Sequence, residues 1–186
     1  MLASRSPQRR AILEQLGVPF SVRVTDADEL TEGPPEEVAL ENAYRKASAA
    51  VSALAGEGGG GAAVLGVDTI VALGSRIYGK PADRRAARKT LRALSAARHT
   101  VISGVCLIED ERVRTAAART QVEFRALPEA TIEWYLDTGE WRERAGGYAV
   151  QGRGALLVSG IDGDYLNVVG LPVAALVDLA PWLIAG

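Results

Sequence analysis

Short runs of small and β-branched side chains alternate with longer helical patterns along the chain, and the central run surrounds an aspartate. Residues 62–65 are apolar, and the run continues through Asp68 to Leu73. Such runs are typical of strands buried on both faces, so we predict a hairpin over residues 62–78. A buried carboxylate is costly unless a cation, a metal or a hydrogen-bond donor lies beside it. Asp68 therefore either caps a neighbouring turn or belongs to a functional site.

The tripeptide after this hairpin places a lysine near the same end of the sheet. Gly79 allows an unusual backbone angle, and Pro81 excludes helix at Lys80. We therefore expect Lys80 on a loop near the end of the hairpin that contains Asp68. A carboxylate and a lysine on neighbouring strand ends suit phosphate and metal chemistry.

The remaining hydrophobic periodicities alternate between helices and strands. Helical spacing of apolar positions predicts helices over residues 7–16, 34–55, 83–97, 128–138 and 171–183. Apolar or alternating runs predict strands over residues 1–3, 18–24, 100–108, 113–126, 155–161 and 167–169. The chain is therefore predicted to be a single α/β domain over residues 1–186 with a mixed sheet.

Two segments with positive charge are candidates for anion binding. Ser4 and Arg9 belong to a serine-rich loop and the start of a helix that Ser6 is expected to cap. Free N–H groups, hydroxyls and arginines at a helix N-terminus favour an anion, although an ordinary capped helix with solvated arginines is the alternative. Lys46 lies on the helix over residues 34–55, where it either borders the buried alanine stripe or is an exposed lysine.

Three loops add further candidates. The acidic loop over residues 26–35 contains Glu29, which is either solvated or available to a metal. The glycine-rich segment 56–61 follows a helix and precedes a strand, the reverse of a dinucleotide-binding loop, so we interpret it as a flexible connector. Glycines in the loop 144–154 predict close backbone packing. Within it, Gln151 either reads the edge of a base or caps a turn.

Composition narrows the function classes. The chain has 21 Lys and Arg against 23 Asp and Glu, a net charge of −2, whereas nucleic-acid-binding proteins usually carry a basic excess. The single His99 excludes a multi-histidine metal site, so we expect any metal to be a hard cation held by oxygen atoms. Cys106 lies in an apolar run and is expected to be an inert core residue. We see no membrane span and no signal peptide in residues 1–10, and we expect a cytoplasmic protein.

With these stretches identified, the sequence resembles the Maf family of nucleoside triphosphate pyrophosphatases over nearly its full length. The resemblance rests on five motifs in order: LASRSPQR at 2–9, ENAYRKA at 41–47, GVDTIV at 66–71 with GKP at 79–81, LS at 94–95 with His99, and AGGYAVQG at 145–152 followed by VVGLP at 168–172. The family implies a two-lobed α/β fold of the Maf/ITPase type, with a long mixed β-sheet and a nucleotide cleft between the lobes. It also implies hydrolysis of a nucleoside triphosphate to the monophosphate and pyrophosphate, with a divalent cation such as Mg²⁺ or Mn²⁺.

The resemblance assigns roles to individual residues. Asp68 matches the family's catalytic carboxylate, which is taken as the base for the attacking water. The matches to the family's phosphate-site residues are Ser4, Arg9, Lys46 and Lys80. Glu29, in a matching Asp-Glu pair, is expected to hold the metal together with Asp68.

Three specificity positions favour the branch of the family that acts on dTTP and UTP. That branch usually has Arg, Thr and Gln, and the branch that acts on 7-methyl-GTP tends to have Trp, Gln and Glu. This chain has Gln8, Thr69 and Gln151, so two positions match the first branch, whereas Gln8 matches neither and lacks the positive fork of arginine. The alternative to an enzyme is a non-catalytic nucleotide-binding regulator of cell division. An RNA-binding domain fits the net negative charge poorly. Because members of the family often pair, the resemblance also raises the expectation of a homodimer.

Overall fold

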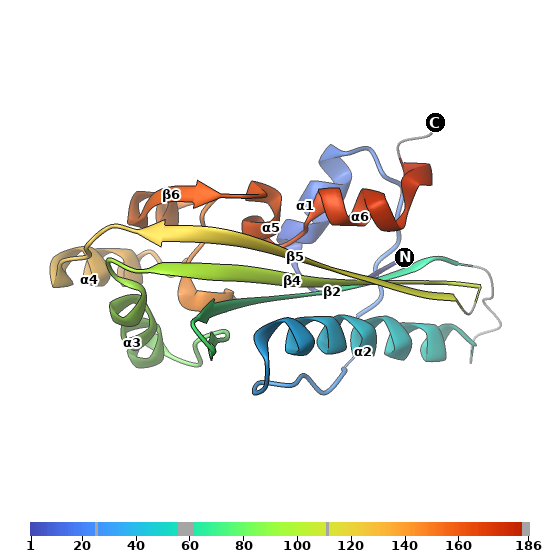
Figure 1. Ribbon diagram of the computed structural model, residues 1–186, viewed down its shortest axis with the longest axis horizontal. Helices are drawn as coiled ribbons and strands as arrows, with labels where there is room; N and C mark the ends of the chain where they lie inside the picture. The colour runs from blue at the N-terminus through green and yellow to red at the C-terminus, as the bar shows by residue number, and fades with distance from the viewer. Residues whose placement is uncertain (25, 56–61, 111, 184–186) are drawn as a thin grey trace.

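A long mixed sheet forms the centre of the protein in the computed structural model, which describes residues 1–24, 26–55, 62–110 and 112–183 (Figure 1). Within these residues the sheet has six strands, in the order β1-β2-β4-β5-β6 with β3 paired to β2. The strands are β1 (Leu2–Ala3), β2 (Val64–Leu73), β3 (Arg76–Tyr78), β4 (Arg98–Glu109), β5 (Arg112–Phe124) and β6 (Val158–Asp162). β1 is parallel to β2 and the other pairs are antiparallel. The predicted mixed α/β sheet and its central hairpin are therefore confirmed.

Helix α2 (Pro35–Ala55) lies along β2 and β4 at the distance of backbone contact. Its buried stripe consists mainly of alanines, and the two facing strands have glycines where the helix crosses them. A Cβ on Gly66 would lie 2.1 Å from the carbonyl oxygen of Ala43, and one on Gly104 would lie 2.2 Å from that of Ala39. Because the backbones approach this closely, short polar side chains of α2 can reach residues of the sheet.

Helices gather at the two ends of the sheet and form two lobes that share β2, β4 and β5 (Figure 1). One lobe contains α1 (Pro7–Gln15), α2 and α6 (Val173–Leu179), and the other contains α3 (Arg84–Leu94) and α4 (Glu129–Asp137). Each end has its own apolar core. Leu13, Leu65 and Leu176 belong to the first, and Leu91 and Tyr135 belong to the second. The expected two-lobed arrangement is therefore present.

Two predicted strands are wrong. Residues 18–24 form one isolated bridge, between Val22 and Leu2, because β1 is only two residues long and offers little edge for pairing. Residues 167–169 belong to helix α5 (Tyr165–Val169), since Asp164 caps its first turn and Gly170, with φ 128°, ends it. This capping outweighs the β-propensity of the paired valines.

Several predicted boundaries also shift. Residues 153–157 form the short 3₁₀ helix η2 (Arg153–Leu157), so the strand predicted from residue 155 begins only with β6. The final helix stops at Leu179 because Pro181 disfavours helix at the preceding residue, and η3 (Pro181–Leu183) follows. Cys106 is buried as predicted, and burial raises its pKa to about 11. The predicted connector over residues 56–61 lies outside the described residues.

Candidate active site

A cleft of about 620 Å³ brings together every site residue predicted from the sequence. Its lining comes from both lobes, from the start of α1 and the acidic loop before α2 on one side to the loop before η1 (Ala145–Gly147) on the other. The predicted residues among its lining are Ser4, Gln8, Arg9, Glu29, Lys46, Asp68, Thr69, Lys80 and Gln151. Residues spread over the whole sequence therefore face one space.

Asp68 is a buried carboxylate held by two side chains of α2. The ammonium of Lys46 lies 2.6 Å from Asp68 Oδ1, and the amide of Asn42 donates to Oδ2 at 3.1 Å. Only 6% of Asp68 is exposed, so its charge depends on these partners rather than on water. Its partners come from a helix, which argues against the alternative that Asp68 caps a neighbouring turn.

Lys46 lies between two carboxylates. Besides Asp68, its ammonium contacts Glu29 Oε1 at 2.8 Å, and only 14% of the lysine side chain is exposed. The alternative of an exposed lysine is therefore wrong. Asp68 and Glu29 converge on one cation, which is the arrangement that oxygen ligands need to share a metal ion. Among the described residues no cluster of three or more His, Cys, Asp or Glu is placed to hold a metal.

Asn42 is a site residue that the sequence interpretation missed. Its Oδ1 accepts from the N–H of Leu30 at 2.7 Å, and its Nδ2 donates to the carbonyl of Leu30 at 3.0 Å as well as to Asp68. Asn42 therefore fastens the loop that contains Glu29 to the helix that holds Asp68. The signal was available: a polar residue interrupts the buried alanine stripe of α2.

Arg9 is a buried cation whose side-chain hydrogen bonds within the described structure all go to neutral oxygens. Its three guanidinium nitrogens donate to Ser4 Oγ at 2.9 Å, Thr69 Oγ1 at 3.0 Å and the carbonyl of Gly170 at 2.8 Å. Burial lowers the pKa of Arg9, and the charges of Asp68 and Glu29 partly offset this effect. In the described part of the chain no carboxylate forms an ion pair with Arg9, so its charge is available to an anion.

The other predicted residues lie at the rim of the cleft. Lys80 faces Glu143 at 3.5 Å, and both side chains are largely exposed. Gln151 is exposed, and Gln8 accepts a hydrogen bond from the hydroxyl of Ser6 at 3.0 Å. Such side chains can turn toward a ligand without breaking a buried network.

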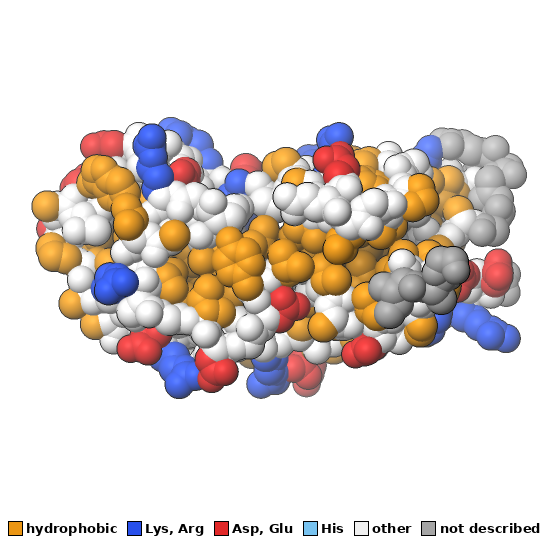
Figure 2. All heavy atoms as spheres, turned by 90° about the horizontal axis from the view of Figure 1, so that it is seen from above, with side chains coloured by type: hydrophobic (Ala, Val, Ile, Leu, Met, Phe, Trp, Pro, Cys, Tyr) orange, Lys and Arg blue, Asp and Glu red, His pale blue; other side chains and the backbone are white. Residues whose placement is uncertain are grey.

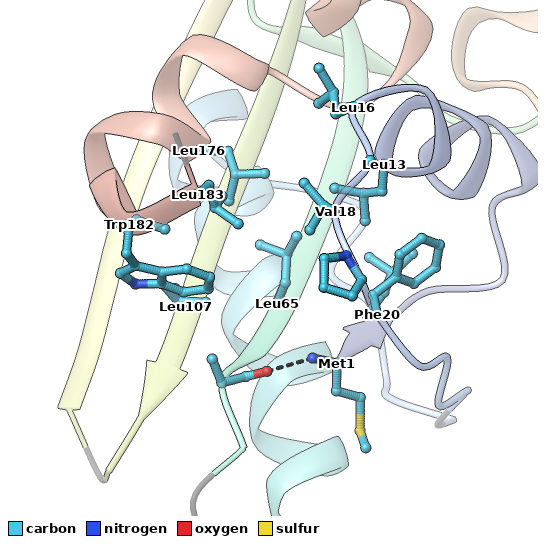
Figure 3. A pocket seen from close by; sticks show the side chains of 15 residues that line it. Met1, Leu13, Leu16, Val18, Phe20, Leu65, Leu107, Leu176, Trp182 and Leu183 are labelled. Atoms are coloured by element: carbon cyan, nitrogen blue, oxygen red, sulfur yellow. Dashed lines mark hydrogen bonds between the residues drawn. The ribbon is translucent and has the colours of Figure 1, made fainter. Parts of the chain in front are cut away.

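A second hollow, of about 310 Å³, is unsuited to a phosphate (Figure 3). It lies between α1 and α6, and its described lining is apolar, including Leu13, Leu65 and Leu176, with no Lys or Arg. The hydrogen bond drawn there joins the N-terminal amine of Met1 to the carbonyl of Ala63 at 2.6 Å. The cleft around Asp68 is therefore the better candidate for a charged ligand.

Three of the five basic side chains of helix α3 are paired with acids rather than free. Arg84, Arg88 and Arg92 form ion pairs with acidic side chains of α4, chiefly Glu129 and Glu133. On the face seen in Figure 2, lysines and arginines are scattered among acidic side chains. This pattern argues against nucleic-acid binding, which needs a basic patch. No helix among the described residues is long and apolar enough to cross a membrane.

Comparison with known proteins adds a family and several relatives. The family model described as "Maf-like protein" matches residues 1–181. A protein from Pyrococcus furiosus named "dTTP/UTP pyrophosphatase" is 41% identical over 183 residues, which cover 96% of this chain and 92% of that protein. Relatives with the same name from Symbiobacterium thermophilum and Exiguobacterium sibiricum are 43% and 44% identical, over 93% of this chain and 88% and 86% of their own lengths.

Proposed function

We propose that this chain, which belongs to the family of Maf-like proteins, hydrolyses nucleoside triphosphates to the monophosphate and pyrophosphate, with dTTP and UTP as the favoured substrates. The reaction and substrates are those that the names of its relatives state. The observation that carries the proposal is the convergence of Asp68 and Glu29 on Lys46 in a cleft that also holds Arg9, which pairs with no carboxylate among the described residues.

Arg9, Lys46 and Lys80 would neutralise the phosphate chain. A triphosphate carries several negative charges, and its cleavage needs that charge stabilised by preorganised cations and donors. Arg9 is already oriented by Ser4 and Thr69, so it loses little freedom when a phosphate binds. Ser4, fixed in the same network, would add a hydroxyl to the phosphate site.

Asp68 and Glu29 fit a divalent cation, Mg²⁺ or Mn²⁺. Mg²⁺ sites in nucleotide enzymes typically use one or two carboxylates and complete their shell with water and substrate phosphates. The two carboxylates already bind one cation, the Lys46 ammonium, at 2.6 and 2.8 Å. When bound, the metal would polarise a phosphoryl oxygen and lower the pKa of a bound water.

Asp68 would act on the attacking water as a general base. A base must lie within hydrogen-bond reach of the proton that it removes, and Asp68 is a cleft residue whose two oxygens are each held by one partner from α2. Each carboxylate oxygen can accept more than one hydrogen bond, so capacity for water remains. Asn42 and Lys46 would keep the carboxylate aimed into the cleft.

Thr69 and Gln151 would contribute to the choice of pyrimidine. The Thr69 hydroxyl is fixed by Arg9 and lies 2.8 Å from Ser103 Oγ, whereas the Gln151 amide is exposed at the rim and can pair with the edge of a base. Gln8, where arginine is usual, replaces a charged fork with a neutral amide. We therefore expect the substrate range to be broader, or the affinity weaker, than in relatives that keep the arginine.

A substrate panel tests this proposal. Release of pyrophosphate would be measured from dTTP, UTP, CTP, purine triphosphates and 7-methyl-GTP, with and without Mg²⁺. The proposal predicts metal-dependent release that is fastest with dTTP or UTP. Preference for 7-methyl-GTP would move the chain to the other branch, and nucleotide binding without turnover on the whole panel would support a regulator instead. Because nucleoside triphosphates are cytoplasmic metabolites, we expect the protein in the cytoplasm. That the chain forms a homodimer stays a separate prediction.

A further inference from the structure

Arg144 is a second arginine of the cleft that has no carboxylate partner among the described residues. The basic side chains that line the cleft are Arg5, Arg9, Lys46, Lys80 and Arg144. Three of them are paired with acids: Arg5 with Asp26, Lys46 with Glu29 and Asp68, and Lys80 with Glu143. Arg9 and Arg144 have no such acidic partner in the described structure, and they come from different lobes.

The loop around Arg144 is docked against the segment that contains Lys80. The N–H of Gly147 donates to the Arg144 carbonyl at 3.0 Å, and the N–H of Gly146 donates to the Gly79 carbonyl at 3.2 Å. Both glycines have positive φ, and a Cβ on Gly147 would lie 3.1 Å from Pro81. Arg144 and Lys80 therefore lie on two loops that a backbone hydrogen bond joins.

The surroundings of Arg144 favour an anionic partner. Its side chain is half-buried, and its Nε is buried without a hydrogen-bond partner in the described structure. Burial lowers the pKa of Arg144, with a smaller opposing effect of Tyr135, Glu140 and Glu143. A partly desolvated charge without a paired acid is costly unless a ligand of opposite charge completes it.

We propose that Arg144 binds the phosphate chain of the substrate together with Lys80, from the lobe that contains α3 and α4, while Arg9 binds it from the other lobe. This inference rests on the proposed function, because it takes a nucleoside triphosphate as the ligand. Arginines from both lobes would then contact the same phosphate chain, so the bound ligand would bridge the two sides of the cleft. Arginine suits this role because its planar fork can bind two phosphate oxygens at once.

The test uses Arg144→Gln and Arg144→Lys, with Arg142→Gln as the matched control. Arg142 lies two residues earlier, is exposed, stacks on the Trp141 ring at 4.8 Å and does not line the cleft.

For each protein, steady-state KM for dTTP would be measured together with calorimetric affinities for inorganic pyrophosphate and for thymidine. Loss of one charge-assisted hydrogen bond predicts that Arg144→Gln weakens pyrophosphate binding and raises KM by about tenfold to a hundredfold. Arg144→Lys should fall between this variant and the unmodified protein, and thymidine affinity and the Arg142→Gln control should be unchanged.

The outcomes separate this inference from the proposed function. Unchanged pyrophosphate affinity in Arg144→Gln, or a loss confined to thymidine, would overturn the role of Arg144 even if hydrolysis is confirmed. If the unmodified protein hydrolyses no triphosphate, the proposed function fails, whereas the pyrophosphate titration still decides whether Arg144 binds phosphate. Circular dichroism and thermal unfolding of the Gln variant would verify that it is folded.

Discussion

The ammonium of Lys46 lies 2.6 Å from Asp68 Oδ1, although the two residues are 22 positions apart in the chain. The contact exists because α2 packs directly on the backbone of β2 and β4, where Gly66 and Gly104 have no side chains to hold the helix away. Glu29 reaches the same ammonium. Lys46 comes from helix α2, Asp68 from strand β2 and Glu29 from the loop before α2. Each of these contributions can therefore be changed by a separate substitution.

Replacement of Lys46 by methionine removes the cation and keeps most of the side-chain volume. We expect kcat to fall by about 10² to 10³, the cost of removing one preorganised charge or donor from a transition state. Lys89→Met is the control, because Lys89 is exposed on α3 and does not line the cleft. The steady-state rate of dTTP hydrolysis would be measured for both variants. An unchanged rate in Lys46→Met would show that the Lys46 ammonium does not contribute to catalysis.

Asn42→Ala should loosen the connection between Asp68 and the Glu29 loop. Loss of the buried amide is expected to cost about 1–3 kcal/mol of unfolding free energy and to weaken Mn²⁺ binding by about 10- to 100-fold, as for other residues that orient metal ligands. Mn²⁺ affinity can be measured by electron paramagnetic resonance without turnover.

The control for Asn42→Ala is the neighbouring Glu41→Gln. Glu41 forms a partly exposed ion pair with Arg45, so its change should alter stability by no more than about 0.5 kcal/mol. If Asn42→Ala loses stability but keeps its Mn²⁺ affinity, Asn42 supports the fold and does not position the metal ligands.

Gly104→Ala should displace α2. The added carbon would lie 2.2 Å from the Ala39 carbonyl oxygen, so the helix must move away and take Asn42 and Lys46 with it. We expect a loss of at least about 1–3 kcal/mol in unfolding free energy, measured by urea denaturation, together with loss of hydrolysis. Gly160→Ala on β6, where nothing lies within 4 Å of the new carbon, should be nearly silent. Equal stability of the two variants would contradict the close packing of α2.

The single imidazole gives a pH prediction. His99 is buried, pairs with the hydroxyl of Tyr148 at 2.9 Å, and burial lowers its pKa to about 4. In the unfolded chain a histidine has a pKa of about 6.5, so between pH 6.5 and the folded pKa only the unfolded state binds the extra proton. The stability that neutral His99 contributes is therefore complete above about pH 6.5. It is lost progressively as the pH falls toward the folded pKa of about 4. Proton NMR of this one ring should show a midpoint near 4, and His99→Gln should flatten the stability profile in this range. A midpoint near 6.5 would contradict the burial.

The sequence predicted which residues share one cleft better than it predicted the details of the fold. Asp68 stood out because a charge in an apolar run requires a partner, and the family motifs named the residues that share its cleft. The helix at residues 165–169 was missed because its evidence is a cap, Asp164, and a stop, Gly170, around valines that favour strands. Asn42 left a signal that was overlooked, a polar residue in the buried alanine stripe of α2. The proposed role of Arg144 depends on the loop docked beside it, a tertiary property that spacing along the chain does not report.

Product analysis of dTTP turnover by the unmodified protein and by Asp68→Asn, with and without Mg²⁺, tests directly whether Asp68 drives metal-dependent release of pyrophosphate. If Asp68 is the general base, dTMP and pyrophosphate form in equal amounts and only with the metal, and the rate in Asp68→Asn is lower by about 10² to 10⁴, the usual contribution of general-base catalysis. Asp178→Asn, at an exposed position of α6 away from the cleft, should behave as the unmodified protein. A full rate in Asp68→Asn would rule out Asp68 as the base, and products that are dTDP and inorganic phosphate would rule out a pyrophosphatase.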